Sequence, residues 1–84
     1  MPEGWADGLA DFTQVLLRDG QGDIYYRVVT GVDRVVLEAV LRHVEGNQVK
    51  ASEILGISRT TLRAKMRALR MEIRKELNHA QRQP

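Results

Sequence analysis

The chain has 84 residues, no cysteine, and 13 basic against 11 acidic residues, for a formal net charge of +2. This length predicts a single domain, and the lack of cysteine excludes a disulfide framework and a thiolate metal site. His43 and His79 lack the spacing of metal ligands, so we expect no metal or other cofactor. No apolar run is long enough to span a bilayer, and residues 1–11 lack the features of a secretory signal. We therefore expect a soluble domain.

The charge is distributed unevenly along the chain. Residues 1–40 hold seven acidic and three basic residues, whereas residues 58–75 hold seven basic residues and one acidic residue. A basic segment of this kind is typical of a surface that meets a polyanion, and a solvated basic helix face is the common alternative. Charge alone does not decide between the two.

The N-terminal half predicts two helices. Residues 7–18 place their apolar side chains near one face of a helix, which the Asp-Gly-Gln-Gly segment 19–22 ends. Asp23 is suited to cap a second helix that extends to about Glu45, with a kink or break possible at Gly31. Although valine favours strands, the apolar residues of this segment recur with a period near 3.6, which predicts a helix.

A helix-turn-helix pattern follows. Gly46 is suited to the C′ position of the second helix, where the backbone is left-handed, and Asn47 to the N-cap of a third helix over 48–55. Gly56 can supply the positive φ of a tight turn. Ser58 can then cap a fourth helix, because its hydroxyl can accept a hydrogen bond from a backbone N–H of the first turn.

The fourth helix presents basic and hydroxyl side chains beside an apolar stripe. Leu62 and Met66 are expected to hold it to the core. The stripe continues to Leu77, which predicts a helical extension and tail over 71–84, either as a continuation of this helix past Arg70 or as a second short helix. A helix fits the major groove of B-DNA, where Arg can bind guanine and Thr can contact phosphate or a thymine methyl group. The candidate DNA-binding residues are therefore Asn47, Ser58, Arg59, Thr60, Thr61, Arg63, Lys65 and Arg67.

These residues closely resemble the C-terminal DNA-binding domain of the Fis family. That family comprises factor for inversion stimulation and the C-terminal domains of bacterial enhancer-binding proteins. The residues before Gly46 are similar to the nitrogen-regulator C branch of the enhancer-binding proteins. Members of that branch are response regulators of two-component systems. The resemblance covers about residues 22–69, and its motif is Gly46-Asn47-Gln48, Ala51-Ser52, Leu55-Gly56-Ile57-Ser58-Arg59, Thr61-Leu62-Arg63 and Lys65-Met66.

The resemblance implies an all-α, Fis-like four-helix domain, with dimerisation helices over about 7–45 and the helix-turn-helix over about 47–70. It implies a homodimer that binds an inverted repeat of double-stranded DNA in the bacterial cytoplasm, as part of the nucleoid. The full-length activator would add an ATPase domain that works with sigma-54 RNA polymerase. The second helix carries more apolar surface than one small domain covers, which agrees with a dimer interface at Val28, Val29, Val32, Val36 and Val40.

Three positions depart from the family pattern. Val49 and Ala64 stand where polar residues are common, which removes two possible DNA contacts. Arg70 replaces a frequent glycine, which predicts a fourth helix extended at its C-terminal end. Two alternatives remain open: a stand-alone Fis-like protein that bends DNA, and a helical dimerisation module that binds none. No catalytic set and no GxxxxGK[ST] phosphate loop occurs in the sequence, so we do not expect an enzyme.

Overall fold

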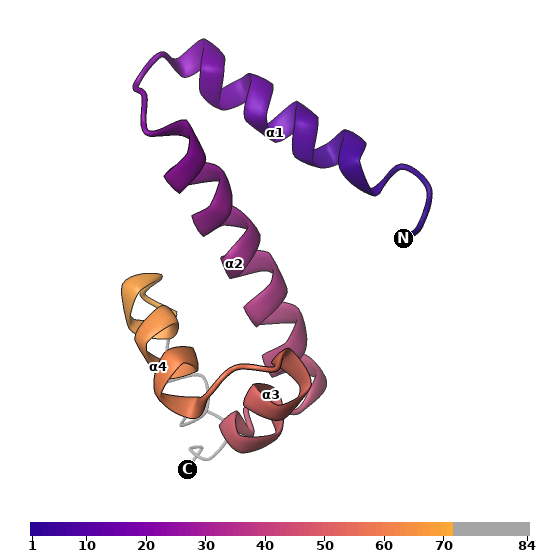
Figure 1. Ribbon diagram of the computed structural model, residues 1–84, viewed down its shortest axis with the longest axis vertical. Helices are drawn as coiled ribbons and strands as arrows, with labels where there is room; N and C mark the ends of the chain where they lie inside the picture. The colour runs from indigo at the N-terminus through magenta and orange to yellow at the C-terminus, as the bar shows by residue number, and fades with distance from the viewer. Residues whose placement is uncertain (72–84) are drawn as a thin grey trace. The chain divides into compact units, whose positions relative to one another are not determined.

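The computed structural model describes residues 1–71, and they form four α-helices (Figure 1). The helices are α1 (Trp5–Asp19), α2 (Ile24–His43), α3 (Gln48–Leu55) and α4 (Arg59–Ala68). This described part contains no strand, and the prediction of an all-α fold is confirmed. The helical extension predicted for 71–84 lies outside the described residues, apart from Met71, which is not helical.

The chain divides into two compact units, Met1–Val32 and Asp33–Pro84, with the boundary inside α2. The first unit contains α1 and the N-terminal turns of α2. The second contains the rest of α2 together with α3 and α4, and therefore the whole helix-turn-helix.

In the first unit, a glycine allows α1 and α2 to pack closely. A β-carbon built on Gly31 would lie 2.8 Å from Cε2 and 3.0 Å from Cζ of Phe12, so no larger residue fits there without moving the ring. α2 runs through Gly31 as one helix, without the break that the sequence allowed. An ion pair of 3.0 Å between Arg27 and Asp19 also joins α2 to the end of α1.

The start of α2 differs from the prediction in its backbone. Asp23 directly precedes the helix, and its carbonyl accepts a hydrogen bond from the Arg27 N–H at 2.9 Å. Its φ of 53°, however, is left-handed, whereas a residue that caps through its side chain normally has an extended backbone. The predicted side-chain cap is therefore replaced by a left-handed turn into the helix.

The end of α2 is a Schellman motif shifted by one residue from the prediction. The Glu45 N–H donates to the Arg42 carbonyl at 3.1 Å, and the Gly46 N–H donates to the Leu41 carbonyl at 2.8 Å. These bonds make Glu45, with φ 56°, the C′ residue. Gly46 is left-handed as expected, with φ 85°, but it occupies the next position.

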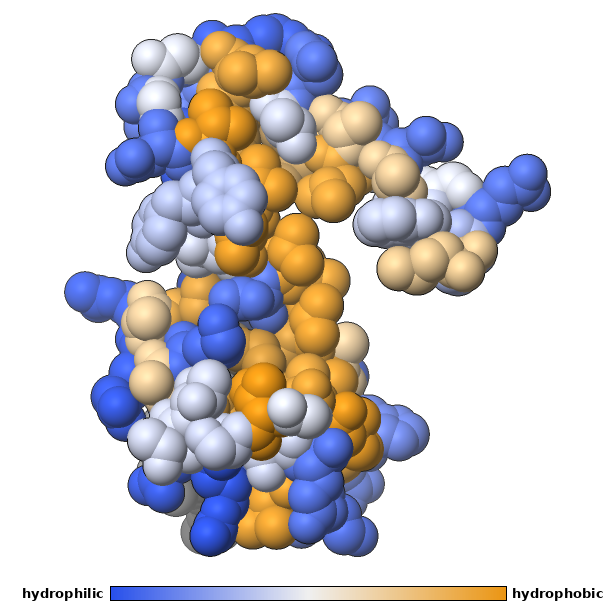
Figure 2. All heavy atoms as spheres, in the orientation of Figure 1, coloured by the Kyte–Doolittle hydropathy of each residue, from blue (hydrophilic) through white to orange (hydrophobic). Residues whose placement is uncertain are grey.

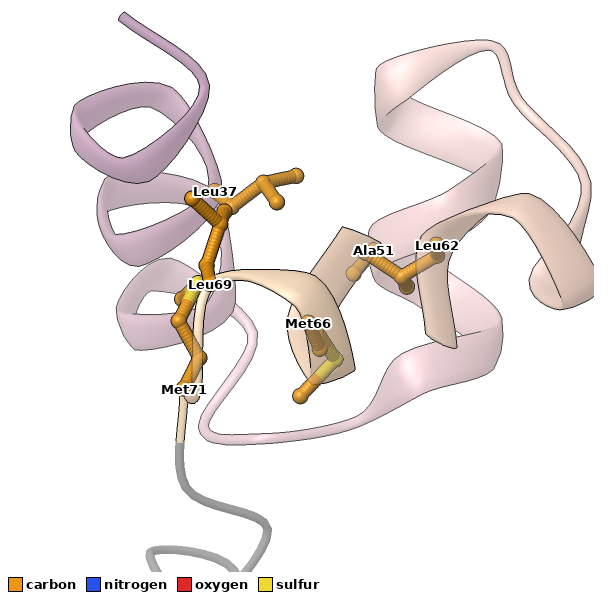
Figure 3. Close-up of a cluster of buried hydrophobic side chains, with 6 residues drawn as sticks. All are labelled: Leu37, Ala51, Leu62, Met66, Leu69 and Met71. Carbon is orange, nitrogen blue, oxygen red and sulfur yellow. The ribbon is translucent and has the colours of Figure 1, made fainter. Parts of the chain in front are cut away.

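The core of the second unit joins α2, α3 and α4. Leu37 comes from α2 and Ala51 from α3, while α4 and the residues after it supply the rest (Figure 3). Ala51 and Leu62 are fully buried. The core comprises Leu37, Ala51, Leu62, Met66, Leu69 and Met71, with Val40, Leu41, Val44, Leu55 and Ile57 packed against it. Leu62 and Met66 therefore anchor α4 as the sequence predicted.

α4 ends at Ala68, which corrects the prediction that it continues past Arg70. The Arg70 N–H donates to the Arg67 carbonyl at 3.0 Å, and the Met71 N–H donates to the Met66 carbonyl at 2.8 Å. This is again a Schellman motif, and Arg70 takes the left-handed C′ conformation, with φ 56°, that glycine adopts most readily. The turn carries Met71 back into the core, where it is buried.

Candidate nucleic-acid interface

The turn between α3 and α4 has the predicted geometry. Gly56 is left-handed with φ 77°, and its N–H donates to the Ser52 carbonyl at 2.9 Å. The Ile57 N–H donates to the same carbonyl at 3.1 Å, and the Ile57 side chain packs against the core. Ser52 itself is buried, as its small size allows, and its hydroxyl donates to the Val49 carbonyl. Together these contacts fix α4 relative to α3.

Both helices of the motif begin with the predicted side-chain caps. Asn47 Oδ1 accepts from the Lys50 N–H at 3.1 Å at the start of α3. Ser58 Oγ accepts from the Thr61 N–H at 3.0 Å and donates to Thr61 Oγ1 at 2.9 Å at the start of α4. All three side chains are exposed and therefore lie where a ligand can approach the two helix starts.

The exposed face of α4 is basic. Residues in an α-helix are about 100° apart around its axis, so Thr60, Ala64 and Arg67 lie opposite the buried Leu62 and Met66. Arg59 and Arg63 are also exposed, and with Arg67 they follow one another at intervals of four residues along one side of α4. Within the described residues, no carboxylate pairs with any of these three arginines. They are therefore free to meet an anionic ligand.

Lys65 differs from the other predicted contacts. It is half-buried, and its Nζ lies 3.1 Å from Oδ2 of Asp33 on α2. The adjacent Arg34 also connects α2 to the end of α4, since its guanidinium donates to the Leu69 carbonyl. Asp33 was not among the residues that the sequence singled out.

The helix-turn-helix and the turn after it are rich in basic residues. Residues 47–71 contain six basic residues and one acidic residue, Glu53. Lys50 and Arg70 add two exposed cations that were not among the candidates.

Within residues 1–71, no group of three or more possible metal ligands occurs, and no helix has the length and hydropathy to cross a membrane. The arrangement is suited to a polyanion.

The comparison with known families decides the classification. The model described as "Bacterial regulatory protein, Fis family" matches residues 29–69. These residues are a helix-turn-helix domain of the Fis family. The family resemblance predicted from the sequence is thereby confirmed, and the match covers the C-terminal part of α2, both helices of the motif and the turn after α4.

Several curated proteins are similar to the chain. A Fis-like DNA-binding protein of Pseudomonas aeruginosa is 51% identical over 45 residues, which cover 54% of this chain and 43% of that protein. The DNA-binding transcriptional regulator NtrC of Escherichia coli K12 is 34% identical over 71 residues, covering 84% of this chain and 15% of the regulator. DNA-binding protein Fis of Aliivibrio fischeri is 40% identical over 45 residues, covering 54% and 46%.

The chain thus spans less than half the length of these relatives. No solved structure matches it significantly.

Proposed function

We propose that this Fis-family domain binds double-stranded DNA by placing α4 in the major groove. One observation carries the proposal: α4 exposes Arg59, Arg63 and Arg67 along one side, and within residues 1–71 none of the three has a carboxylate partner. A helix presented in this way can reach base edges while the protein around it contacts phosphates. The names of the Pseudomonas, Escherichia and Aliivibrio relatives, which all describe DNA-binding proteins, support the same ligand.

Within this proposal, each candidate residue has a defined part. Arg63 and Arg59 donate to guanine edges, and Thr60 and Arg67 lie on the exposed face beside them. Asn47, Ser58 and Thr61 contact the DNA backbone, because phosphate is favoured at a helix start by its free N–H groups and its dipole. Lys65 belongs to the predicted set, but its ammonium group is already paired with the Asp33 carboxylate.

We further propose that the domain is a homodimer that binds an inverted repeat. Val29 and Val32 are each 38% exposed and Val36 is 43% exposed, and their spacing of three and four residues places them along one stripe of α2. Val28, four residues before Val32, and Val40, four residues after Val36, are half-buried. Figure 2 shows apolar side chains at the surface along α2. A second copy would cover this stripe and bring two α4 helices to two half-sites.

The proposed biological setting is a bacterial transcriptional activator of the enhancer-binding type, acting in the cytoplasm. The alignment with the regulator NtrC supports it, since it extends over 71 residues and so beyond the helix-turn-helix. In that setting a separate ATPase domain would work with sigma-54 RNA polymerase. The 51% identity to the Pseudomonas Fis-like protein supports the second candidate, a stand-alone DNA-bending protein.

The test is fluorescence anisotropy with a duplex selected from a random pool and with a scrambled duplex, at several salt concentrations. We expect preference for an inverted repeat, and Arg63→Ala should abolish that preference. Arg18→Ala is the matched control, because Arg18 is an exposed arginine that belongs to α1 and not to the motif. Equal, weak binding to both duplexes would favour the DNA-bending protein, and no binding at all would leave a helical dimerisation module.

A further inference from the structure

Asp33 and Lys65 are separated by 32 residues in the chain but form one ion pair, with 3.1 Å between Lys65 Nζ and Asp33 Oδ2. This is a hydrogen-bonding distance as well as an ion-pair distance, so the contact is a charge-assisted hydrogen bond. Both side chains are partly buried, with 40% of Lys65 and 33% of Asp33 exposed. The ammonium group is therefore held against α2.

The position of Lys65 on α4 explains this orientation. Lys65 directly precedes the buried Met66 and follows the buried Leu62 by three residues, so it lies at the border between the core and the exposed face. Arg63 and Arg67, two residues away on either side, are exposed. Of the four carboxylates between residues 33 and 71, Asp33 is the one that pairs with a cation of α4.

A phosphate group at this place would meet both charges. The Asp33 carboxylate stays within about 3 Å of the ammonium group and repels the phosphate that Lys65 attracts, so the two contributions largely cancel. Releasing Lys65 would in turn leave Asp33 unpaired beside the DNA. The pair thus enters the interface as a neutral group, unlike the unpaired arginines of α4.

We infer that Asp33 neutralises Lys65, so that Lys65 positions α4 on α2 and does not bind a DNA phosphate. This inference rests on the proposed DNA-binding function. It makes Asp33 a residue that limits affinity: the domain contacts one phosphate fewer per subunit than its count of basic residues indicates. The salt dependence of binding measures this directly, because each phosphate neutralised contributes about 0.9 to the slope of log K against log salt concentration.

The experiment compares the wild-type chain with Asp33→Asn, Lys65→Gln and the double variant Asp33→Asn/Lys65→Gln, each against the selected duplex from 50 to 200 mM salt. The double variant replaces the ion pair by two uncharged groups of similar size. We expect it to match the wild type in both affinity and slope. Asp33→Asn alone should steepen the slope by about 0.9 per subunit, which changes its affinity relative to wild type about 3.5-fold per subunit across this range.

Lys65→Gln alone should bind more weakly with an unchanged slope, because Asp33 then repels the DNA while no phosphate contact is lost. Arg67→Gln is the positive control, and its slope should fall by about 0.9 per subunit. The inference is overturned if the double variant or Lys65→Gln loses slope as Arg67→Gln does, since Lys65 would then bind phosphate. Absence of salt-dependent binding by the wild type would instead overturn the proposed function itself.

A second readout does not depend on the folding of the variants. In the wild-type complex with DNA, we expect no coupling through a hydrogen bond between the Lys65 side-chain nitrogen and DNA phosphorus in a nuclear magnetic resonance experiment. Observation of that coupling would also overturn the inference.

Discussion

The ring of Phe12 lies so close to Gly31 that a β-carbon at residue 31 would stand 2.8 Å from Cε2 of the ring. Glycine normally weakens the interior of a helix, by about 1 kcal/mol relative to alanine. In α2 this loss is offset by the close packing of α1, because the aromatic ring occupies the space that a methyl group would fill. The glycine is a packing residue of the N-terminal unit.

This contact predicts different results for two glycine substitutions. Gly8 lies inside α1 with open space around it, so Gly8→Ala should raise the free energy of unfolding by about 0.5–1 kcal/mol. Gly31→Ala should gain less or destabilise, because Phe12 must move. When Phe12 is also replaced by alanine, Gly31→Ala should raise the free energy of unfolding by as much as Gly8→Ala does in the wild type. Urea unfolding of the wild type and these four variants tests this, and equal effects at both glycines in the wild-type background would refute the contact.

The left-handed Arg70 predicts that the natural residue is not the most stable one. Arg70→Gly should raise the free energy of unfolding by about 0.5–1 kcal/mol. A left-handed conformation costs residues other than glycine about 1–2 kcal/mol, and glycine removes this cost. Part of the gain is lost because glycine also makes the unfolded chain more flexible. Arg70→Ala is the control, since alanine removes the side chain but keeps the strain. Thermal unfolding should therefore show a gain for glycine alone.

The capping bond of Ser58 predicts a local loss at the start of α4. Ser58→Ala removes the acceptor of the Thr61 N–H and should lower the free energy of unfolding by about 1 kcal/mol. Thr60→Ala, at an exposed neighbour, should change it by less than about 0.5 kcal/mol. Denaturant titrations followed by circular dichroism compare the two, and an equal loss for both would show that the cap does not stabilise the helix.

The exposed valines of α2 predict the effect of a buried charge on the proposed dimer. Val36→Asp should raise the dissociation constant of the dimer at least about 100-fold, because an unpaired carboxylate in an apolar interface costs several kcal/mol. Val49→Asp is the control: Val49 is 45% exposed, close to the 43% of Val36, but lies on α3. Sedimentation equilibrium measures the dissociation constant of the dimer for each variant. A monomeric wild type, or dissociation by both variants, would contradict the proposed interface.

The local features of the helix-turn-helix were predictable because they depend on neighbouring residues. Asn47, Ser58 and Gly56 each have a side chain or backbone preference that suits one helix end, and the structure places each of them there. The buried Leu62 and Met66 followed from helical spacing in the same way. These few positions fix the geometry of α3, the turn and α4.

The remaining features depend on contacts that no local pattern contains. The pairing of Asp33 with Lys65 joins residues 32 positions apart, and the fit of Phe12 on Gly31 joins two different helices. The end of α4 differs from the prediction because Arg70 adopts the left-handed conformation that glycine usually supplies. Burial of Met71 stabilises the turn at Arg70 despite its backbone cost.

The burial of Met71 also determines how short a working fragment can be. The family match ends at residue 69, yet the side chain of Met71 is 8% exposed and belongs to the same core cluster as Leu37 and Met66. A clone trimmed to the family boundary would remove this side chain and the hydrogen bond from the Met71 N–H to the Met66 carbonyl. Expression of the isolated motif for crystallisation should therefore keep the chain at least to residue 71.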